Sequence, residues 1–342
     1  MSSFGENWTF TGFGESHGAA VGGVLDGVPA GLHIDLDMIR EELDRRAGRS
    51  LTPPLSRREG VSSRAMKEPD EVEWLSGVIE NTDRCADGTQ STDLITLGTP
   101  IAFIIRNKDA RPEDYEWLRH TYRVGHADKV YELKYGIRDW RGGGRASARE
   151  TAGRVVAGCI AKQQLAQRGI TIHAELIQVG AETDPARYAD TIAAYQQDGD
   201  SIGGIIECRI NGMPVGVGEP VFDKLQAHLA FAIMSINACK GFEYGTGFGG
   251  VTQAGSAINA ISGGISGGIS DGSEIVFRCV FKPTPSTPKA GVKGRHDACV
   301  AVRAVPVVEA MTALAIINLT EQQEYGNNSR DTQTYRGGME AV

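Results

Sequence analysis

Glycine is the residue type that most limits what this chain can fold into. The sequence contains 44 glycines among 342 residues, clustered at 141–144, 245–250 and 262–272 without a collagen-like period. Glycine adopts backbone conformations that are closed to other residues and leaves space beside its Cα atom. The clusters therefore predict a globular fold that depends on tight turns and close backbone contacts.

One cluster lies in the segment YGIRDWRGGGRASARET, residues 135–151, which also holds four arginines. Three glycines in a row let backbone N–H groups approach a ligand, and Arg141, Arg145 and Arg149 can add charge-assisted hydrogen bonds to a phosphate or carboxylate. The G-K-[ST] ending of a P-loop is absent. We interpret this segment as an anion-binding site rather than a solvated basic loop.

A long helix is predicted directly after these glycines, from Ser147 to about Arg168. Ser147 and Glu150 have the S-x-x-E spacing of a capping box, and Gly169 supplies a C-terminal stop. The free N–H groups at the start of such a helix favour anions. The helix is therefore expected to complete the anion site.

The remaining chain predicts helices and strands without regular βαβ alternation. Helices are expected at 35–46 and 221–241 and, kinked or restarted at Pro306, within 294–316; strands are expected at 100–107, 171–180, 205–218 and 274–281. This order favours an α+β fold with helices packed on antiparallel or mixed sheet. We expect one catalytic domain over residues 1–320 and a polar, disordered tail over 321–342.

Composition excludes several classes of function. The formal net charge of −8 argues against a nucleic-acid-binding protein, because binding to a phosphate backbone needs a basic surface. Six cysteines without a CxxC pair predict reduced thiols and neither a zinc site nor a disulfide framework. The N-terminus lacks the pattern of a signal peptide, and no stretch approaches eighteen consecutive apolar residues. We therefore expect a cytoplasmic protein without a membrane span or a metal site.

Three of the seven histidines lie in glycine-containing segments beside Ser, Asp or Glu. They are His17 in FGESHG, His126 in VGHAD and His296 in KGRHDAC. Such histidines can donate and accept protons near neutral pH, so we predict a role in acid–base chemistry. The other four, His33, His120, His173 and His228, are interpreted as structural.

A nicotinamide dehydrogenase is the obvious alternative to an anion-binding enzyme of another class. GFGESHG begins with G-x-G, but the third glycine comes too late and no amphipathic helix follows. The dinucleotide-binding fingerprint requires both features. The sequence therefore gives this alternative little support.

Several motifs, in order along the chain, resemble those of the chorismate synthase family. They are FGESHG, HAD followed by KYGIRDWRGGGRASARETA, GEPVFDKL, SINACKGFEYG, GGISGGIS, KPTPS and KGRHDACVAVRAVPVVEAM. The resemblance covers about residues 9–318. It implies a β-α-β sandwich that assembles as a homotetramer. It also implies conversion of 5-enolpyruvylshikimate 3-phosphate to chorismate and phosphate, in the shikimate pathway to the aromatic amino acids.

The resemblance also implies a cofactor, reduced FMN, which the family needs although the reaction has no net redox change. By position, His17 corresponds to the residue that protonates the departing phosphate, and His126 to the one that keeps reduced flavin correctly protonated. Asp297 corresponds to the aspartate that helps to remove the substrate proton, and Ser16 and Ser147 to proton-relay serines.

Cofactor contacts follow in the same way. Flavin contacts are expected from Arg145, Ala146, Ser147, Asn237, Ala238, Gly267, Lys282, Pro283, Thr284, Pro285, Ser286 and Arg295. Arg46 corresponds to an arginine assigned to NADPH or anion binding, with NADPH as a candidate reductant.

Several loops depart from the family pattern. RRAGRS at 45–50 stands where the family has R-P-G-Q-S, and Leu51 replaces the next arginine, which removes one NADP-type contact. Segments 51–65 and 81–95 look inserted, and the segments before 262 and before 293 are short. An impaired or noncatalytic flavin- or anion-binding paralogue therefore stays open as a second hypothesis, beside an NADP-dependent oxidoreductase.

Overall fold

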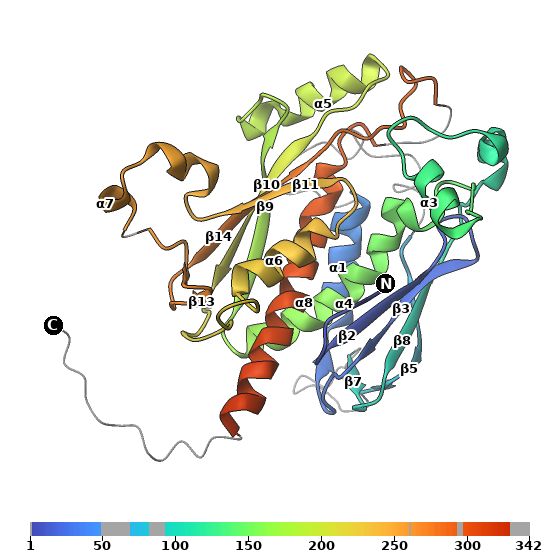
Figure 1. Cartoon of the computed structure of the whole chain (residues 1–342). Helices are drawn as coiled ribbons and strands as arrows, with labels where there is room; N and C mark the ends of the chain where they lie inside the picture. The colour runs from blue at the N-terminus through green and yellow to red at the C-terminus, as the bar shows by residue number, and fades with distance from the viewer. Residues whose placement is uncertain (1, 49–68, 82–92, 260, 293–296, 329–342) are drawn as a thin grey trace, which may run out of the picture.

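The computed structural model describes residues 2–48, 69–81, 93–259, 261–292 and 297–328, and in the last range the side chains up to residue 322 (Figure 1). Two antiparallel sheets enclose a layer of helices, as Figure 1 shows with α1, α4 and α8 between the strands. This arrangement confirms the predicted α+β fold and its β-α-β sandwich.

The first sheet has the strand order β1-β2-β3-β8-β5. Its strands are β1 (Ser3–Phe4), β2 (Thr9–Gly14), β3 (Ala20–Asp26), β8 (Ile101–Arg106) and β5 (Val72–Ser76). A small sheet beside it contains β4 (His33–Ile34), β7 (Leu94–Thr96) and β6 (Val78–Glu80). A Cβ atom on Gly153 of the covering helix would lie 3.1 Å from the Gly22 carbonyl oxygen of β3. Glycine thus lets that helix pack directly on the sheet.

The second sheet has the order β11-β14-β10-β9. Its strands are β11 (Cys239–Tyr244), β14 (Ile275–Phe281), β10 (Gly204–Asn211) and β9 (Thr171–Val179). Strands β12 (Ile265–Ser266) and β13 (Ile269–Ser270) pair with each other in a separate two-stranded sheet. All recorded pairings in the described chain are antiparallel.

The central layer contains α1 (Leu36–Ala47), α4 (Thr151–Gln167), α6 (Leu225–Met234) and α8 (Ala301–Asn328). Peripheral helices are α3 (Asp128–Tyr135), α5 (Tyr188–Gln197) and α7 (Gly255–Ile258), and 3₁₀ turns occupy 112–120, 144–146, 148–150, 185–187 and 247–252. α4 and α8 cross closely because Gly158 faces the backbone of Ala310. Buried aliphatic residues from both sheets and these helices form one continuous core.

Helix α8 is the only described helix long and apolar enough to cross a membrane, but 83% of its most apolar window is buried inside the protein. It is therefore a core helix. Asn318 on α8 accepts hydrogen bonds from the backbone N–H groups of Glu6, Asn7 and Trp8 at 2.8–3.1 Å, which fixes the N-terminal segment to the core. The cysteines among the described residues are free and buried.

Four of the eight predicted elements are confirmed, namely the helix at 35–46 and the strands at 100–107, 171–180 and 274–281. Two predictions were too long. The strand at 205–218 ends at Asn211, before Gly212 turns the chain with φ 78°. The helix at 221–241 shrinks to α6, Val221 is 66% exposed, and the chain continues as strand β11.

The predicted capping box is wrong. Ser147 accepts a hydrogen bond from the N–H of Arg149 at 3.3 Å and begins a 3₁₀ turn, so α4 starts only at Thr151. The Glu150 carboxylate pairs with Arg154 instead of returning to Ser147. At the other end of the chain, Pro306 lies inside α8, and α8 continues past the predicted boundary at residue 321 to Asn328.

Candidate active site

Gly142–Gly144 bring together side chains from separate parts of the chain. All three glycines have positive φ, 64°, 93° and 51°. A Cβ atom on the first would overlap Nδ1 of His17, on the second it would lie 2.9 Å from Cε1 of His126, and on the third it would overlap Oε2 of Glu15. Each glycine therefore makes room for a titratable side chain, and the loop joins the FGESHG and VGHAD segments.

His17 lies in the turn between β2 and β3. Its Nδ1 is 3.1 Å from Oγ of Ser16, and both side chains are buried. Tyr115 contacts the imidazole edge-on, with 4.8 Å between ring centroids. Asn107 holds the turn by donating to the carbonyl oxygens of Glu15 and Gly18, both at 2.9 Å. His17 and Ser16 are thus placed as a hydrogen-bonded pair, as a proton relay requires.

His126 lies in the turn that precedes α3. Its Nδ1 is 2.9 Å from Oδ1 of Asp128, and its side chain is 13% exposed. Burial raises the pKa of Asp128, but hydrogen bonds from Arg123 and His126 outweigh burial and hold that pKa well below its usual value. Asp128 therefore stays ionised beside His126.

The expected flavin residues at 237–238 and 282–286 contact each other, Ser147 and the loop of His126. Asn237 Nδ2 donates to the carbonyl oxygen of Ser147 at 3.2 Å, and the N–H of Lys282 donates to the Ala238 carbonyl at 3.0 Å. Lys282 Nζ donates to the carbonyl oxygen of Gly125 at 3.1 Å. Burial lowers the pKa of Lys282, and nearby Lys240 adds to this effect.

The backbone at Ala238, between helix α6 and strand β11, has an unusual conformation. Ala238 has φ 70°, which costs energy for a residue with a Cβ atom. The left-handed turn redirects the chain from α6 into β11.

The KPTPS segment, residues 282–286, is fixed by a hydrogen bond from outside the segment. The hydroxyl of Ser201 donates to the Thr284 carbonyl oxygen at 2.7 Å, and Ser286 is buried. Pro285 lies beside Gly125 of the histidine loop.

Asp297 and Arg46 belong to one buried polar network. Arg303 donates to Asp297 Oδ2 at 2.7 Å and to the Arg46 carbonyl oxygen at 2.9 Å. The Arg46 guanidinium is itself enclosed, donating to Asp70 Oδ2 at 2.9 Å and to Thr151 Oγ1 at 3.1 Å. Burial lowers the pKa of Arg46 to about 9, and Asp70 opposes that change. The predicted NADPH contact is thus placed in the interior of the protein.

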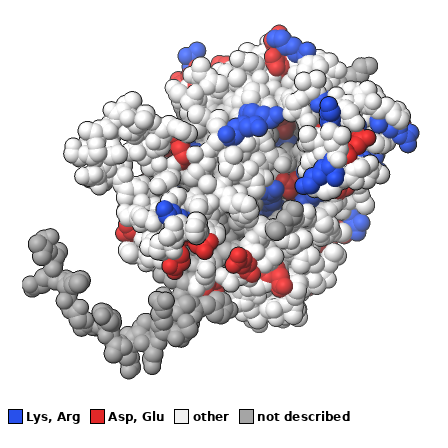
Figure 2. Space-filling model, in the orientation of Figure 1, with Lys and Arg blue, Asp and Glu red and all other residues white. Residues whose placement is uncertain are grey.

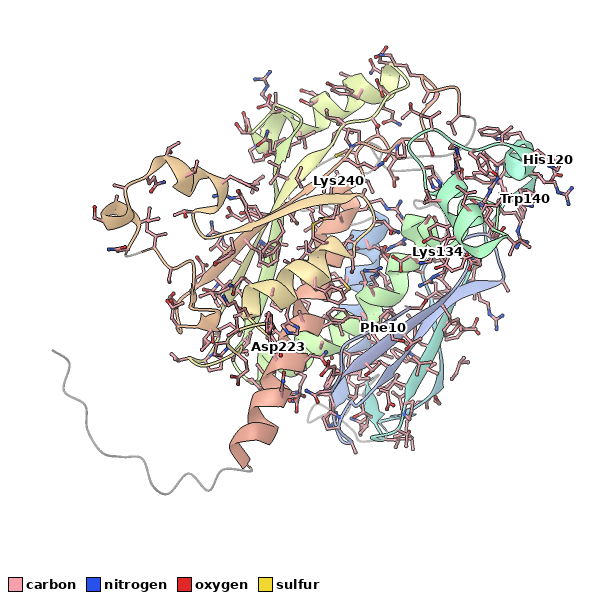
Figure 3. All side chains as sticks on the ribbon, in the orientation of Figure 1. Phe10, His120, Lys134, Trp140, Asp223 and Lys240 are labelled. Atoms are coloured by element: carbon pink, nitrogen blue, oxygen red, sulfur yellow. The ribbon has the colours of Figure 1, made fainter. Side chains whose placement is uncertain are left out.

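A cavity of about 770 Å³ opens on one side of the glycine-rich loop. Apolar side chains of Phe4, Phe10, Tyr131, Tyr135, Ile137, Phe231 and Met311 line it together with polar and charged side chains of Glu15, Arg138, Asp139, Arg145, Glu150, Arg154 and Asn237. Figure 3 shows Phe10 on β2 and Lys134 on the neighbouring helix α3. The cavity combines an apolar wall with cationic groups, which suits an anionic ligand that carries a ring.

Arg145 is the predicted anion-binding arginine that faces this cavity. Its Nη1 donates to the Gly14 carbonyl oxygen at 3.3 Å, and its Nη2 is 3.9 Å from Glu150. Burial raises the pKa of the neighbouring Glu15 above its ordinary value, although the charge of Arg145 opposes this change. On the face shown in Figure 2, Lys and Arg side chains gather over the upper and right-hand parts, where α3 lies. The cationic region is therefore local, as expected for a chain of net negative charge.

Other predicted residues lie elsewhere. Arg141 pairs with Asp139 at 2.8 Å, and Arg149 binds Asp70 and Asn107. Neither arginine is among the residues that line the cavity. Gly267 turns the β12–β13 hairpin, whose Gly268 contacts the start of α6, while Asn237 follows the end of α6. Arg295, His296 and the departures at 49–65 lie outside the described residues.

Three charged residues that line the cavity were not predicted as site residues from the sequence, namely Glu15, Asp128 and Arg138. Glu15 and Asp128 stand inside the FGESHG and VGHAD motifs, so their motifs were the available signal. Arg138 is one of the four arginines of the 135–151 segment, but its partners, Glu132 at 2.8 Å and the backbone carbonyl oxygens of residues 118 and 121, could not be read from the sequence. Within the described ranges, no group of three or more His, Cys, Asp or Glu side chains is placed to hold a metal ion.

Comparison with known proteins agrees with this geometry. The family model described as chorismate synthase matches residues 8–320. The chain is 43% identical to a chorismate synthase from Christiangramia forsetii, with 92% of this chain and 96% of that protein covered. It is 44% identical to one from Bacteroides thetaiotaomicron, with 93% and 97% covered, and 44% identical to one from Methylobacillus flagellatus, with 93% and 94% covered.

A solved structure gives the same result at the level of the fold. A crystal structure of chorismate synthase superposes with a TM-score of 0.68 and 26% sequence identity, and the match covers 94% of this chain and 93% of that one. The family model spans the glycine-rich loop, both histidine turns, Asp297 and the KPTPS segment. From its sequence, its fold and the convergence of these motifs, the chain belongs to the chorismate synthase family.

Proposed function

We propose that His17, His126, Asp297, Ser16 and Ser147 carry out the family's reaction in this chain. The reaction is the anti-1,4-elimination of phosphate from 5-enolpyruvylshikimate 3-phosphate, which gives chorismate for aromatic amino-acid biosynthesis. The single observation that carries the assignment of residues is the contact of His17 and His126 with adjacent glycines of one loop. That contact supports a common site for the two acid–base groups.

The elimination breaks a C–O bond and a C–H bond and forms a C=C bond. The C–O electron pair leaves with phosphate, so a proton donor beside the phosphate lowers the barrier. We assign this donor to His17, whose Nδ1 is hydrogen-bonded to Ser16. We assign removal of the carbon-bound proton to a path that includes Asp297 and Ser147. Arg303 keeps a charge-assisted contact with Asp297 and thereby fixes its position.

The cavity beside the loop fits reduced FMN. Its volume of about 770 Å³ lies within the usual range for ligand sites. Phe10, Tyr131 and Met311 offer apolar surface to a flat ring, and Arg145 offers charge-assisted hydrogen bonds to a phosphate. When bound, reduced FMN supplies electron density that assists departure of the phosphate.

Eight of the expected flavin residues fall into two groups. Arg145, Ala146 and Asn237 line the cavity, whereas Lys282 to Ser286 reach the loop of His126 through Gly125. We propose that NADPH is the electron source for the flavin. Because the Arg46 guanidinium is enclosed by Asp70 and Thr151, we assign Arg46 to shaping the start of α4 rather than to direct contact with NADPH.

We further propose a homotetramer that works in the cytoplasm. Large apolar side chains, among them Phe222, Phe248 and Val251, are exposed on the single chain and support association with further copies. Size-exclusion chromatography with light scattering tests this; a monomer at micromolar concentration contradicts it. The alternatives of a noncatalytic paralogue and of an NADP-dependent oxidoreductase are not favoured, because the reported relatives are named chorismate synthase.

The test is an anaerobic assay with purified protein, chemically reduced FMN and 5-enolpyruvylshikimate 3-phosphate. We expect chorismate and phosphate in equal amounts, many turnovers per flavin without nicotinamide, and no product with oxidised FMN. Absence of product under both conditions contradicts the activity. Consumption of one NADPH per product with prereduced flavin favours the oxidoreductase.

A further inference from the structure

Three charged or titratable side chains meet within six residues of the histidine loop, in the sequence RVGHAD. Asp128 Oδ1 is 2.9 Å from His126 Nδ1 and 2.9 Å from Arg123 Nη2. Asp128 Oδ2 accepts from the backbone N–H of Arg123 at 3.1 Å and from its Nε at 2.8 Å. The guanidinium thus grips both oxygens of the carboxylate, and one of those oxygens faces the imidazole.

The contacts at Nδ1 bear on which imidazole nitrogen carries the proton. An ionised carboxylate only accepts hydrogen bonds, so an unprotonated Nδ1 at 2.9 Å would place two lone pairs against each other. Arg123 Nη2 is also 3.2 Å from Nδ1, and because this nitrogen carries two N–H groups it can donate to Asp128 and to an unprotonated Nδ1 at the same time, which would favour the other tautomer. The contact with the carboxylate is the shorter of the two and faces an ionised oxygen, so we infer that Nδ1–H of His126 donates to Asp128. In the neutral ring, Nε2 is then the acceptor.

Asp128 is held in one place from several directions. Its side chain is 2% exposed, against 13% for His126. Arg138, from the loop after α3, brings Nη1 to 3.9 Å from Oδ1, and Lys282 of the KPTPS segment binds the carbonyl oxygen of the neighbouring Gly125. Arg138 also pairs with Glu132 of α3 at 2.8 Å, so the cations nearest to Asp128 are Arg123 and Arg138. A carboxylate in this setting is a rigid, ionised acceptor.

We propose that Asp128 is a positioning residue, which fixes the Nδ1–H tautomer and the ring orientation of His126 so that the Cε1–Nε2 edge faces Gly143. The backbone of Gly143 supports this direction, because a Cβ atom there would lie 2.9 Å from Cε1 and 3.1 Å from Nε2. Asp128 contacts the Nδ1 side of the His126 ring and leaves Nε2 available for proton transfer. Any effect on turnover rests on the proposed role of His126.

The same chain contains a second, exposed His–Asp pair that serves as a matched control. His228 Nε2 is 3.1 Å from Asp223 Oδ1, and the two side chains are 36% and 61% exposed. Figure 3 places Asp223 at the lower left, far from α3 at the right. An exposed pair is weakened by water and by side-chain freedom. Asp223→Asn therefore removes a His–Asp contact of the same kind, but in an exposed pair instead of a buried one.

The test is nitrogen NMR of the substrate-free protein with ¹⁵N-labelled histidine, with His126 assigned by its loss in His126→Gln. In the wild-type protein we expect the proton of neutral His126 on Nδ1. Asp128→Asn should shift the proton toward Nε2 or mix the two tautomers, whereas Asp223→Asn should leave His126 unchanged. A wild-type His126 protonated at Nε2 overturns the proposal, and this measurement is made on the wild-type protein, with folded His126→Gln needed only for the assignment.

The assay with reduced FMN supplies a second readout. Asp128→Asn should lower kcat at least about tenfold, less than the about 100- to 10,000-fold typical for removing an acid–base group itself, and Asp223→Asn should leave kcat unchanged. Circular dichroism confirms that each variant is folded. An Asp128→Asn protein with wild-type kcat and an unchanged tautomer overturns the proposal. If the wild-type chain makes no chorismate, the proposed function fails while the NMR result still decides the role of Asp128.

Discussion

The backbone of Gly142 lies directly against the imidazole ring of His17, and a Cβ atom on the glycine would overlap Nδ1 and Cε1 of the ring. Gly142 also has φ 64°, a conformation that side chains disfavour. The two residues are far apart in the sequence. Their contact makes the glycine-rich loop one wall of the histidine site.

We therefore predict that Gly142→Ala displaces His17 or the loop. A displacement of about 1 Å at a reacting group can cost about 100-fold in rate, so kcat should fall by about tenfold to 100-fold in a folded protein. The measurement is chorismate formation with reduced FMN. Gly249→Ala is the control, because a Cβ atom at Gly249 meets nothing within 4 Å. Equal activity of the two variants would show that the loop tolerates a side chain at Gly142.

The histidines should separate into two classes in the same assay. His17→Ala and His126→Ala should each lower turnover by about ten- to ten-thousandfold, the range expected for removing an acid–base or charge-stabilising group. His228→Ala should leave turnover nearly unchanged, because His228 contacts the exposed Asp223 at 3.1 Å. A larger loss at His228 than at His126 contradicts the assignment.

Arg145 should carry much of the affinity for the flavin phosphate. Arg145→Ala removes a cavity-lining guanidinium, and a hydrogen bond to a charged group contributes about 1.5–3 kcal/mol, so FMN affinity should fall about tenfold or more. Flavin fluorescence titration measures this. Arg168→Ala, at the far end of α4 and bound to Glu321 at 2.5 Å, is the control. Unchanged FMN affinity in Arg145→Ala would remove the anion-site interpretation.

Local signals made part of the fold predictable from the sequence. The helix at 35–46 was predicted from its apolar period, and Asp35 caps it by accepting from two backbone N–H groups at 2.9 and 3.0 Å. The start of α4 was not predictable, because Glu150 forms a tertiary contact with Asn237 at 3.5 Å as well as its pair with Arg154. No sequence rule indicates that α6 ends at Met234 or that Ala238 adopts φ 70° just before β11.

The site divides in the same way. Flanking glycines identified His17 and His126, and the structure gives the reason, since adjacent glycines of a second loop leave room for both rings. The roles of Arg46 and Arg149 depend on Asp70, which is 24 and 79 residues away in the sequence. Periodicity and motif spacing carry no information about such a pairing. An arginine that binds a ligand and one that is buried in a network look the same in the sequence.

Glu309 on α8 is the centre of a buried ionic cluster between the helices. Its Oε2 accepts from Arg45 Nη1 at 2.8 Å and from Lys162 Nζ at 2.6 Å, and its Oε1 accepts from the N–H of Ala174 at 2.8 Å. Burial raises the pKa of Glu309, but these hydrogen bonds and cations outweigh burial and lower that pKa to about 2. The carboxylate is therefore ionised in the folded protein down to strongly acidic pH.

This shift sets the direction of a pH dependence. The folded pKa of Glu309 lies below its ordinary value of 4.5, so the stabilisation is complete above that value and is lost as the pH falls through about 2. A shift of this size corresponds to roughly 3 kcal/mol. The free energy of unfolding of the wild-type protein should accordingly decrease from about pH 5 downward, with Glu309 as one main contributor.

Glu309→Gln tests this contribution. Near pH 7 the variant leaves Arg45 and Lys162 with Glu42 as their remaining carboxylate, and breaking such a buried pair costs about 3–5 kcal/mol. Because glutamine does not titrate, the gap between the variant and the wild-type protein should narrow as the pH is lowered. Denaturant unfolding at neutral and acidic pH measures both effects. Glu73→Gln, in an exposed pair with Arg106, should change stability little, because water and salt screen that pair. A constant gap between Glu309→Gln and wild type across this pH range would mean that Glu309 does not contribute to the acid sensitivity of the fold.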